Sequence, residues 1–104
     1  MFNSIKKLLG FEETDFIQLM KEGAIILDVR TPDEFSSGHI KGAINISVTK
    51  LTNNLNKLKN KDKAIITCCA SGGRSASAKS ILKANGYTNV HNGGAWISLR
   101  NKIK

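Results

Sequence analysis

The sequence of 104 residues predicts an α/β fold in which helices cover both faces of a parallel sheet. Two apolar runs of strand length, residues 24–29 and 64–68, have the continuous hydrophobicity of strands that are buried on both sides. Helical patterns lie between and after these runs, and such alternation favours parallel pairing. In parallel sheets ligands gather at the carboxyl ends of the strands, where this sequence places Cys69.

The first half of the chain predicts two short helices and a second strand. One helix is expected to start after Asp15, which is suited to cap it, and to stop near Gly23. Residues 31–34 (Thr-Pro-Asp-Glu) offer an N-cap, a proline at the first helical position and an acid at the third. The helix that they begin should end by Gly38, and residues 42–46 form the next predicted strand.

The second half predicts an apolar stripe, two strands and two helices. Leu51, Leu55 and Leu58 recur at helical spacing and make one apolar face. The remaining elements follow in order: a strand at 64–68, a helix over 75–84, a strand at 89–91 and a helix over 95–103. Asn85-Gly86 is a C-terminal stop for the longer helix.

The length and composition are those of one small domain with excess positive charge. Residues 1–10 are expected to form an N-terminal extension or short helix, and residues 11–104 a single domain. The formal net charge is +8, but the lysines are scattered and aromatic residues are few, so we expect attraction of small anions rather than nucleic-acid binding. No apolar run approaches the roughly 20 residues that cross a bilayer. We read no secretory signal and expect a cytoplasmic protein without stable membrane insertion.

The segment Cys69-Ala70-Ser71-Gly72-Gly73-Arg74-Ser75 indicates a site for a reactive sulfur. A cysteine at a strand end, then small residues and a helix start, places a thiol beside unpaired backbone N–H groups. These groups favour the thiolate. Gly72 and Gly73 are expected to adopt backbone angles that other residues resist, and Arg74 can fold its positive charge back over the loop.

The second cysteine is expected to be structural. Consecutive strand residues point to opposite faces, so Cys68 should pack in the core while Cys69 faces the loop. Neighbouring cysteines cannot form a disulfide framework, which favours a reducing compartment. Neither cysteine has metal-ligand spacing with His39 or His91, and we expect no metal and no cofactor.

Two charged residues close the first strand. Asp28 and Arg30 could support substrate binding. The favoured alternative is that they connect neighbouring loops by charge-assisted hydrogen bonds.

Three blocks of sequence together resemble the rhodanese-like family. The first is Leu27-Asp28-Val29-Arg30 with Glu34-Phe35, Gly38-His39-Ile40, Gly42-Ala43 and Asn45-Ile46. The second runs from Cys69 to Ala76, and the third is Gly86-Tyr87-Thr88-Asn89-Val90 with Asn92 to Trp96. The resemblance implies a three-layer fold with a five-stranded parallel sheet and helices on both faces. It also implies sulfurtransfer, in which Cys69 takes a sulfane sulfur from thiosulfate or a persulfide and hands it to a thiol, to a thiol-bearing protein or to cyanide. The backbone N–H groups from Ala70 to Arg74 would hold the terminal sulfur.

Other functions remain as alternatives. The domain could be a sulfur carrier or a partner-binding module without turnover of its own. Cysteine phosphatases and arsenate reductases typically have five residues between the loop cysteine and arginine, whereas four separate Cys69 from Arg74, which fits one sulfur atom better than a tetrahedral oxyanion. Ala70 and Ser71 supply no second cation, so a persulfide donor fits as well as thiosulfate.

Overall fold

The computed structural model describes residues 14–104, so the predicted N-terminal extension over residues 1–10 lies outside the described part. The strands are β1 (Ile25–Asp28), β2 (Ile44–Asn45), β3 (Ile65–Cys69) and β4 (Val90–Ala95). The helices are α2 (Phe16–Lys21), α3 (Pro32–Ser37), α4 (Gly73–Ala84) and α5 (Trp96–Ile103), with two 3₁₀ helices, η1 (Val48–Lys50) and η2 (Thr52–Lys57).

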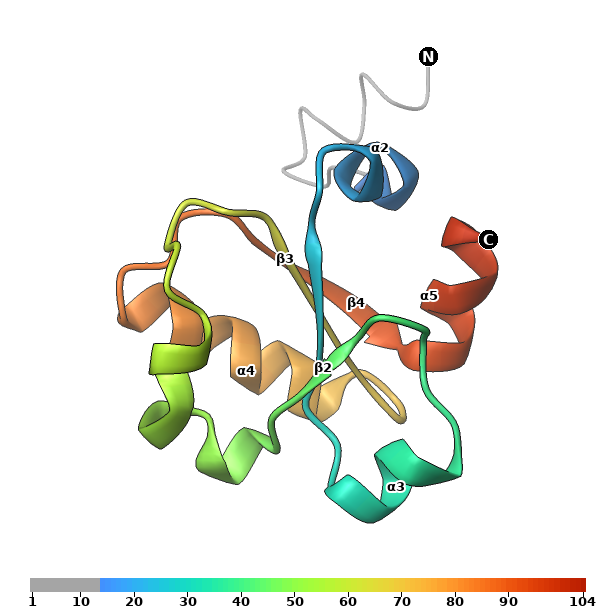
Figure 1. The fold of residues 1–104 in the computed structure, drawn as a ribbon, viewed down its shortest axis with the longest axis horizontal. Helices are drawn as coiled ribbons and strands as arrows, with labels where there is room; N and C mark the ends of the chain where they lie inside the picture. Colours follow the sequence, from blue (N-terminus) through green and yellow to red (C-terminus); the bar gives the residue numbers. More distant parts are fainter. Residues whose placement is uncertain (1–13) are drawn as a thin grey trace.

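The strands pair in parallel in the order β2-β1-β3-β4 (Figure 1). The predicted α/β class is confirmed, but the expected five strands are wrong: residues 14–104 contribute four strands to the sheet. The segment between β2 and β3, where the leucine spacing predicts a helix, forms η1 and η2. Its leucines are three and four residues apart, which suits a turn of helix and not the alternation of a strand.

The predicted leucine stripe between β2 and β3 packs on the sheet, but its backbone is wound as a 3₁₀ helix, which is tighter than an α-helix. Leu51 and Leu58 are fully buried, and Leu55 packs against the same cluster. The segment is 3₁₀-helical, with a kink at Asn54, where φ is −126° and ψ is 20°. Asparagine hydrogen-bonds readily to nearby backbone, and here the Asn54 side chain donates to the Lys50 carbonyl at 2.8 Å.

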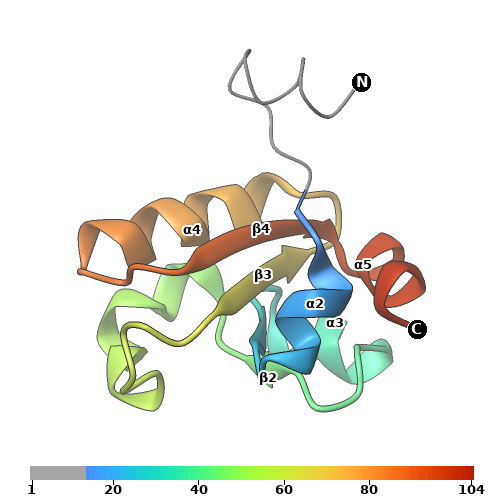
Figure 2. The same ribbon diagram turned by 90° about the horizontal axis from the view of Figure 1, so that it is seen from above.

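Each face of the sheet has its own apolar cluster, so the fold has three layers (Figures 1 and 2). One cluster joins the sheet to α4 and the 3₁₀ helices through Val29, Cys69 and Leu82. The other joins it to α2 and α5 through Cys68 and Leu99. Among the helices of the described residues, none combines the length and apolarity needed to cross a bilayer.

The predicted caps of α2 and α3 are confirmed in atomic detail, whereas α4 begins at Gly73, two residues before its predicted start. Asp15 caps α2 by accepting a hydrogen bond from the Gln18 backbone N–H at 3.0 Å. In α3 the caps are reciprocal: the Thr31 hydroxyl oxygen accepts from the Glu34 N–H, and the Glu34 carboxylate accepts from the Thr31 N–H. These bonds fix Glu34 at the first turn of α3.

Strand order determines where a ligand can bind. The chain leaves β1 toward β2 on one side, and β3 and β4 lie on the other side of β1. The connections that follow β1 and β3 therefore run to opposite sides of the sheet. In such sheets, ligands bind at the carboxyl ends of the two neighbouring strands where the connections part. Asp28 of β1 is paired with Cys68 of β3, so Cys69 lies directly at this point.

Candidate active site

Cys69 is the last residue of β3, and its side chain lies on the α4 face of the sheet. Cys68 points to the opposite face, where it packs with Ile66 and Leu99, so its predicted core position is confirmed. Burial raises the pKa of the Cys68 thiol to about 12, and this thiol therefore stays protonated at neutral pH. Among residues 14–104, no group of three or more His, Cys, Asp and Glu side chains could hold a metal ion.

The Cys69 sulfur receives hydrogen bonds from the loop that follows it. The Gly72 backbone N–H donates to Sγ at 2.9 Å, and the Ser75 hydroxyl oxygen lies 3.5 Å from Sγ. Burial, the largest influence, acts to raise the pKa of the Cys69 thiol. Hydrogen bonds from the Ser75 hydroxyl and from the N–H groups of Ser75, Gly72 and Ser71 together outweigh it, and the pKa is lowered. The thiolate predicted from the sequence therefore has its donors in place.

Ser75 connects the sulfur to the next strand. Its hydroxyl lies 2.6 Å from Asn92 Oδ1 and 2.9 Å from the Gly72 carbonyl oxygen. Asn92 Oδ1 also accepts from the Gly94 N–H at 2.9 Å, which fixes the amide. A hydroxyl has one proton and two lone pairs, so Ser75 can accept from the Cys69 thiol or donate to its thiolate. Asn92 is brought to the site by β4 and was not among the site residues predicted from the sequence.

The loop turns at Gly72, the N-cap of α4. Gly72 has a φ of +110°, a left-handed conformation that favours glycine, and this turn aims its N–H at the sulfur. Gly73 has no positive φ, so the prediction of special backbone angles is confirmed for Gly72 and wrong for Gly73. Gly73 is the first residue of α4 and has helical geometry.

Arg74 holds the loop to another element instead of covering the sulfur with a free charge. Its two terminal nitrogens donate to the two Glu34 carboxylate oxygens at 2.6 and 2.9 Å. The bidentate bonds from Arg74, followed by the Thr31 N–H, lower the pKa of Glu34 to about 2, so the pair is ionised at neutral pH. Glu34 was expected only as a helix cap, because the sequence alone does not place it near residues 40 positions away.

Asp28 and Arg30 form a buried pair. The Arg30 guanidinium donates to both Asp28 oxygens, with the shortest distance 2.7 Å, and also to the carbonyl oxygens of Glu34 and Gly38. The side chains are 0% and 5% exposed for Asp28 and Arg30 respectively. Arg30 also lies over the Trp96 ring, 4.7 Å from its centroid. These contacts match the structural role favoured from the sequence, since every polar end of the pair is bonded to protein.

The hydroxyl of Ser75 provides a test of the thiolate site. In a Cys68→Ala background, we expect Ser75→Ala to raise the pH at which half of Cys69 is ionised, because one donor to the anion is lost while burial persists. The measurement is the rate of alkylation by iodoacetamide as a function of pH.

The matched control for this test is Ser71→Ala, which keeps the backbone N–H that acts on the sulfur and removes only an exposed hydroxyl. Its alkylation profile should coincide with that of the parent. An unchanged profile in Ser75→Ala would show that the Ser75 hydroxyl does not stabilise the thiolate.

The sequence and the fold of this chain are similar to those of known proteins. The model of the rhodanese-like domain family matches residues 12–94. The thiosulfate sulfurtransferase PspE of Escherichia coli is 35% identical over 69 residues, which cover 65% of this chain and 66% of that protein. A solved structure described as rhodanese with anions from E. coli has 31% identity and a TM-score of 0.69, and the match covers 73% of this chain and 91% of that one.

A human protein extends the comparison. The human single-domain sulfurtransferase TSTD1 has 27% identity and a TM-score of 0.72, and the match covers 84% of this chain and 90% of that one. The chain spans 54%, 68% and 66% of the length of three curated relatives, from Bacillus subtilis, Schizosaccharomyces pombe and E. coli. The family match covers most of the described chain and includes the cysteine loop. The chain therefore belongs to the rhodanese-like domain family.

Proposed function

We propose that the protein is a sulfurtransferase that carries sulfur as a persulfide on Cys69. The observation that carries this proposal is the lowered pKa of the Cys69 thiol, with the Gly72 N–H 2.9 Å from Sγ. A thiolate is the reactive form of cysteine in attack on sulfur. The names of PspE and of the human structure, a thiosulfate sulfurtransferase and a sulfurtransferase, support the same chemistry.

The proposed reaction has two displacement steps. The Cys69 thiolate attacks the outer sulfur of thiosulfate, a new S–S bond forms, and sulfite leaves with the electron pair of the broken S–S bond. A thiolate or cyanide acceptor then attacks the outer sulfur of the persulfide, and Cys69 leaves as thiolate. No general base is required, because the attacking sulfur is already ionised. The loop N–H groups of Ser71 and Gly72 stabilise negative charge in both steps.

The proposal leaves two candidates for the sulfur donor, thiosulfate and a persulfide. Ala70 and Ser71 bring no cation to the loop, and the charge of Arg74 is engaged by Glu34. A thiosulfate dianion would therefore depend on the backbone N–H groups and on the general positive charge of the protein. A persulfide carries less charge and needs less compensation.

A sulfur carrier without independent turnover is the second candidate. The proposed site would hold the persulfide in the same way, and a thiol-bearing partner protein would supply or remove the sulfur. We propose that residues 11–104 act as one domain in either case, since the family match runs from residue 12 to residue 94. The free thiols of Cys68 and Cys69 suit a reducing compartment.

The deciding experiment is intact-mass spectrometry after incubation with thiosulfate. We expect the protein to gain the mass of one sulfur atom and to lose it again on addition of cyanide or dithiothreitol. Release of thiocyanate at a steady rate separates an enzyme from a carrier, which would release one equivalent at most. No added sulfur from either thiosulfate or a low-molecular-weight persulfide would disprove the proposal.

A further inference from the structure

The proton of the Ser75 hydroxyl has three competing acceptors. Ser75 Oγ lies 2.6 Å from Asn92 Oδ1 and 2.9 Å from the Gly72 carbonyl oxygen. The Cys69 sulfur, 3.5 Å from Oγ, is the third. A hydroxyl has a single proton to donate, so it serves one of these neighbours at a time. Because Ser75 is 0% exposed, the neighbours decide the direction in which the proton points.

The side chain of Asn92 presents its oxygen to this hydroxyl. Oδ1 also accepts a hydrogen bond from the Gly94 backbone N–H at 2.9 Å, which requires the oxygen of the amide and not its nitrogen. Asn92 can therefore only accept from Ser75. Its oxygen lies closer to Oγ than the Gly72 carbonyl oxygen does, so Asn92 is the stronger of the two oxygen acceptors.

A β-bulge in β4 directs Asn92 toward the site. Beyond the Thr67–Asn92 pair, β3 takes two residues to reach its next paired position and β4 takes three. An extra residue of this kind bends the strand and redirects a side chain. Gly93 follows Asn92 in a tight space, because a Cβ there would lie 2.8 Å from side-chain atoms of Ile66 and Leu99. The backbone around Asn92 is therefore held independently of its side chain.

The three chemical states of Cys69 make different demands on the Ser75 proton. In the thiol, S–H donates to Ser75 Oγ, and the Ser75 proton is left for Asn92 Oδ1. In the thiolate, Sγ carries a full charge, and hydrogen bonds to a charged group are roughly twice as strong as neutral ones, so the proton turns to the sulfur. In the persulfide, Sγ is bonded to a second sulfur that carries the charge, and the proton returns to Asn92.

We propose that Asn92 is a positioning residue: its Oδ1 holds the Ser75 hydroxyl proton while Cys69 is a thiol or a persulfide, and yields it to Sγ in the thiolate. The inference rests on the proposed sulfur transfer and adds a residue of β4 to it. The proton stays covalently bonded to Oγ throughout, and only the direction of its hydrogen bond changes. Since the Asn92–Ser75 bond is lost only in the thiolate, Asn92 favours the loaded protein over the unloaded anion.

Other charges near Cys69 do not account for this effect. The charged and titratable groups on the elements packed around it, all within residues 14–104, are Cys68 of β3, Asp28 and Arg30 at β1, Arg74, Lys79 and Lys83 of α4, Glu34 bonded to Arg74, His91 of β4, and Lys50 and Lys57 of η1 and η2. Of their side-chain types, histidine alone ordinarily titrates close to neutral pH. His91 directly precedes Asn92 in β4, so the two side chains point to opposite faces of the sheet.

The first test measures the ionisation of Cys69 in a Cys68→Ala background, from the rate of alkylation by iodoacetamide as a function of pH. We expect Asn92→Ala to lower the pH at which half of Cys69 is ionised by about half a unit, because the Ser75 proton no longer has to leave the amide oxygen. Asn92 is exposed, so alanine fits there without disturbing the core. Asn92→Asp keeps the acceptor, adds a negative charge and should raise this midpoint.

The decisive variant removes the residue through which Asn92 acts. In a Ser75→Ala/Cys68→Ala background, Asn92→Ala should leave the midpoint unchanged, because no hydroxyl proton remains to be held. A midpoint that stays the same or rises in Asn92→Ala with Ser75 present would overturn the inference. So would a shift of equal size in the absence of Ser75, since Asn92 would then act by another route.

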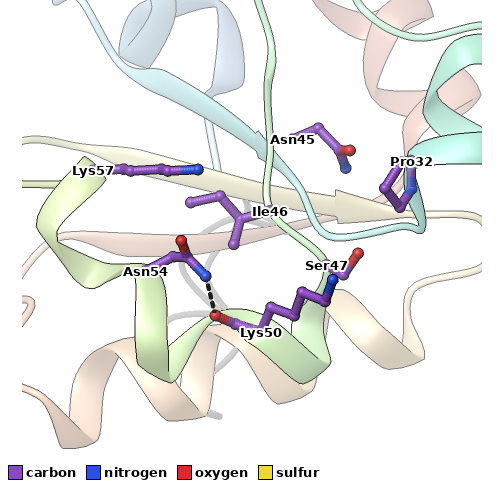
Figure 3. A pocket seen from close by; sticks show the side chains of 7 residues that line it. All are labelled: Pro32, Asn45, Ile46, Ser47, Lys50, Asn54 and Lys57. Carbon is purple, nitrogen blue, oxygen red and sulfur yellow. Dashed lines mark hydrogen bonds between the residues drawn. The ribbon is translucent and has the colours of Figure 1, made fainter.

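The matched control is Asn54→Ala in the same Cys68→Ala background. Asn54 lines a pocket of about 390 Å³ beside β2, and its amide donates to the Lys50 carbonyl oxygen at 2.8 Å (Figure 3). The substitution therefore removes an asparagine amide that is bonded within η1 and η2 and not to Ser75. Its midpoint should equal that of the parent, and a shift as large as that of Asn92→Ala would overturn the assigned role.

The second readout is the loading equilibrium at a fixed ratio of thiosulfate to sulfite, at a pH above both midpoints. Intact-mass spectrometry gives the ratio of persulfide to unloaded protein, which we expect to fall about threefold in Asn92→Ala, the equivalent of half a pH unit. An unchanged ratio beside a lowered midpoint would overturn the role of Asn92 in the persulfide. If the wild-type protein gains no sulfur from any donor, the proposed function fails, while the alkylation midpoints still decide whether Asn92 holds the Ser75 proton.

Discussion

Cys69→Ala is expected to reduce the turnover of thiosulfate with cyanide by at least about a thousandfold, because the variant lacks the thiol on which the proposed persulfide forms. The Cys69 side chain is 1% exposed and contacts the small residues of its own loop, so alanine fits the same space. The initial rate of thiocyanate formation gives the activity. Intact-mass spectrometry of the same sample shows whether sulfur is still gained.

The control for this variant is its neighbour in sequence. Cys68→Ala removes an equivalent thiol on the opposite face, and it should keep the turnover and the added sulfur. Equal rates for wild type and Cys69→Ala would refute the catalytic role. An adduct that persists in Cys69→Ala and disappears in Cys68→Ala would instead identify Cys68 as the carrier.

Arg30→Met is expected to cause the largest loss of stability, about 3–5 kcal/mol, because it leaves the Asp28 carboxylate buried without its cation. Domains of this size lose roughly 4–8 °C in Tm for each kcal/mol, so thermal unfolding monitored by circular dichroism will show it clearly. Methionine keeps much of the apolar volume that packs on Trp96, which limits the change to the charge and its hydrogen bonds.

Arg100→Met is the matched control for Arg30→Met. Arg100 also lies over the Trp96 ring, at 5.2 Å from the centroid, but it is exposed and has no buried partner among residues 14–104. The Tm of the Arg100→Met variant should therefore fall little. A stable Arg30→Met protein with strongly reduced persulfide formation would show that the Asp28–Arg30 pair serves the substrate and not the fold.

Local patterns in the sequence were sufficient for most elements and for the position of Cys69 at the end of a strand. The capping residues of α3 and the apolar runs of β1 and β3 depend on neighbours in the chain, and the structure has them where they were predicted. The opposite faces of Cys68 and Cys69 follow from the geometry of a strand alone.

Features that depend on distant residues could not be predicted in the same way. The Arg74–Glu34 bonds and the Ser75–Asn92 hydrogen bond join residues 40 and 17 positions apart, and spacing carries no signal for such contacts. The fifth strand came from the family resemblance, while the residues themselves had indicated four. Gly73 was grouped with Gly72 because composition does not distinguish a turn position from the first residue of a helix.

The bonds of Glu34 limit how far the cysteine loop can be treated as a transferable unit. One carboxylate completes the cap of α3 and clamps Arg74 at the start of α4. A loop grafted onto another scaffold as residues 69–75 alone would lose this clamp. A protein engineer would have to transplant the first turn of α3 together with the loop, and to exchange Glu34 and Arg74 only as a pair.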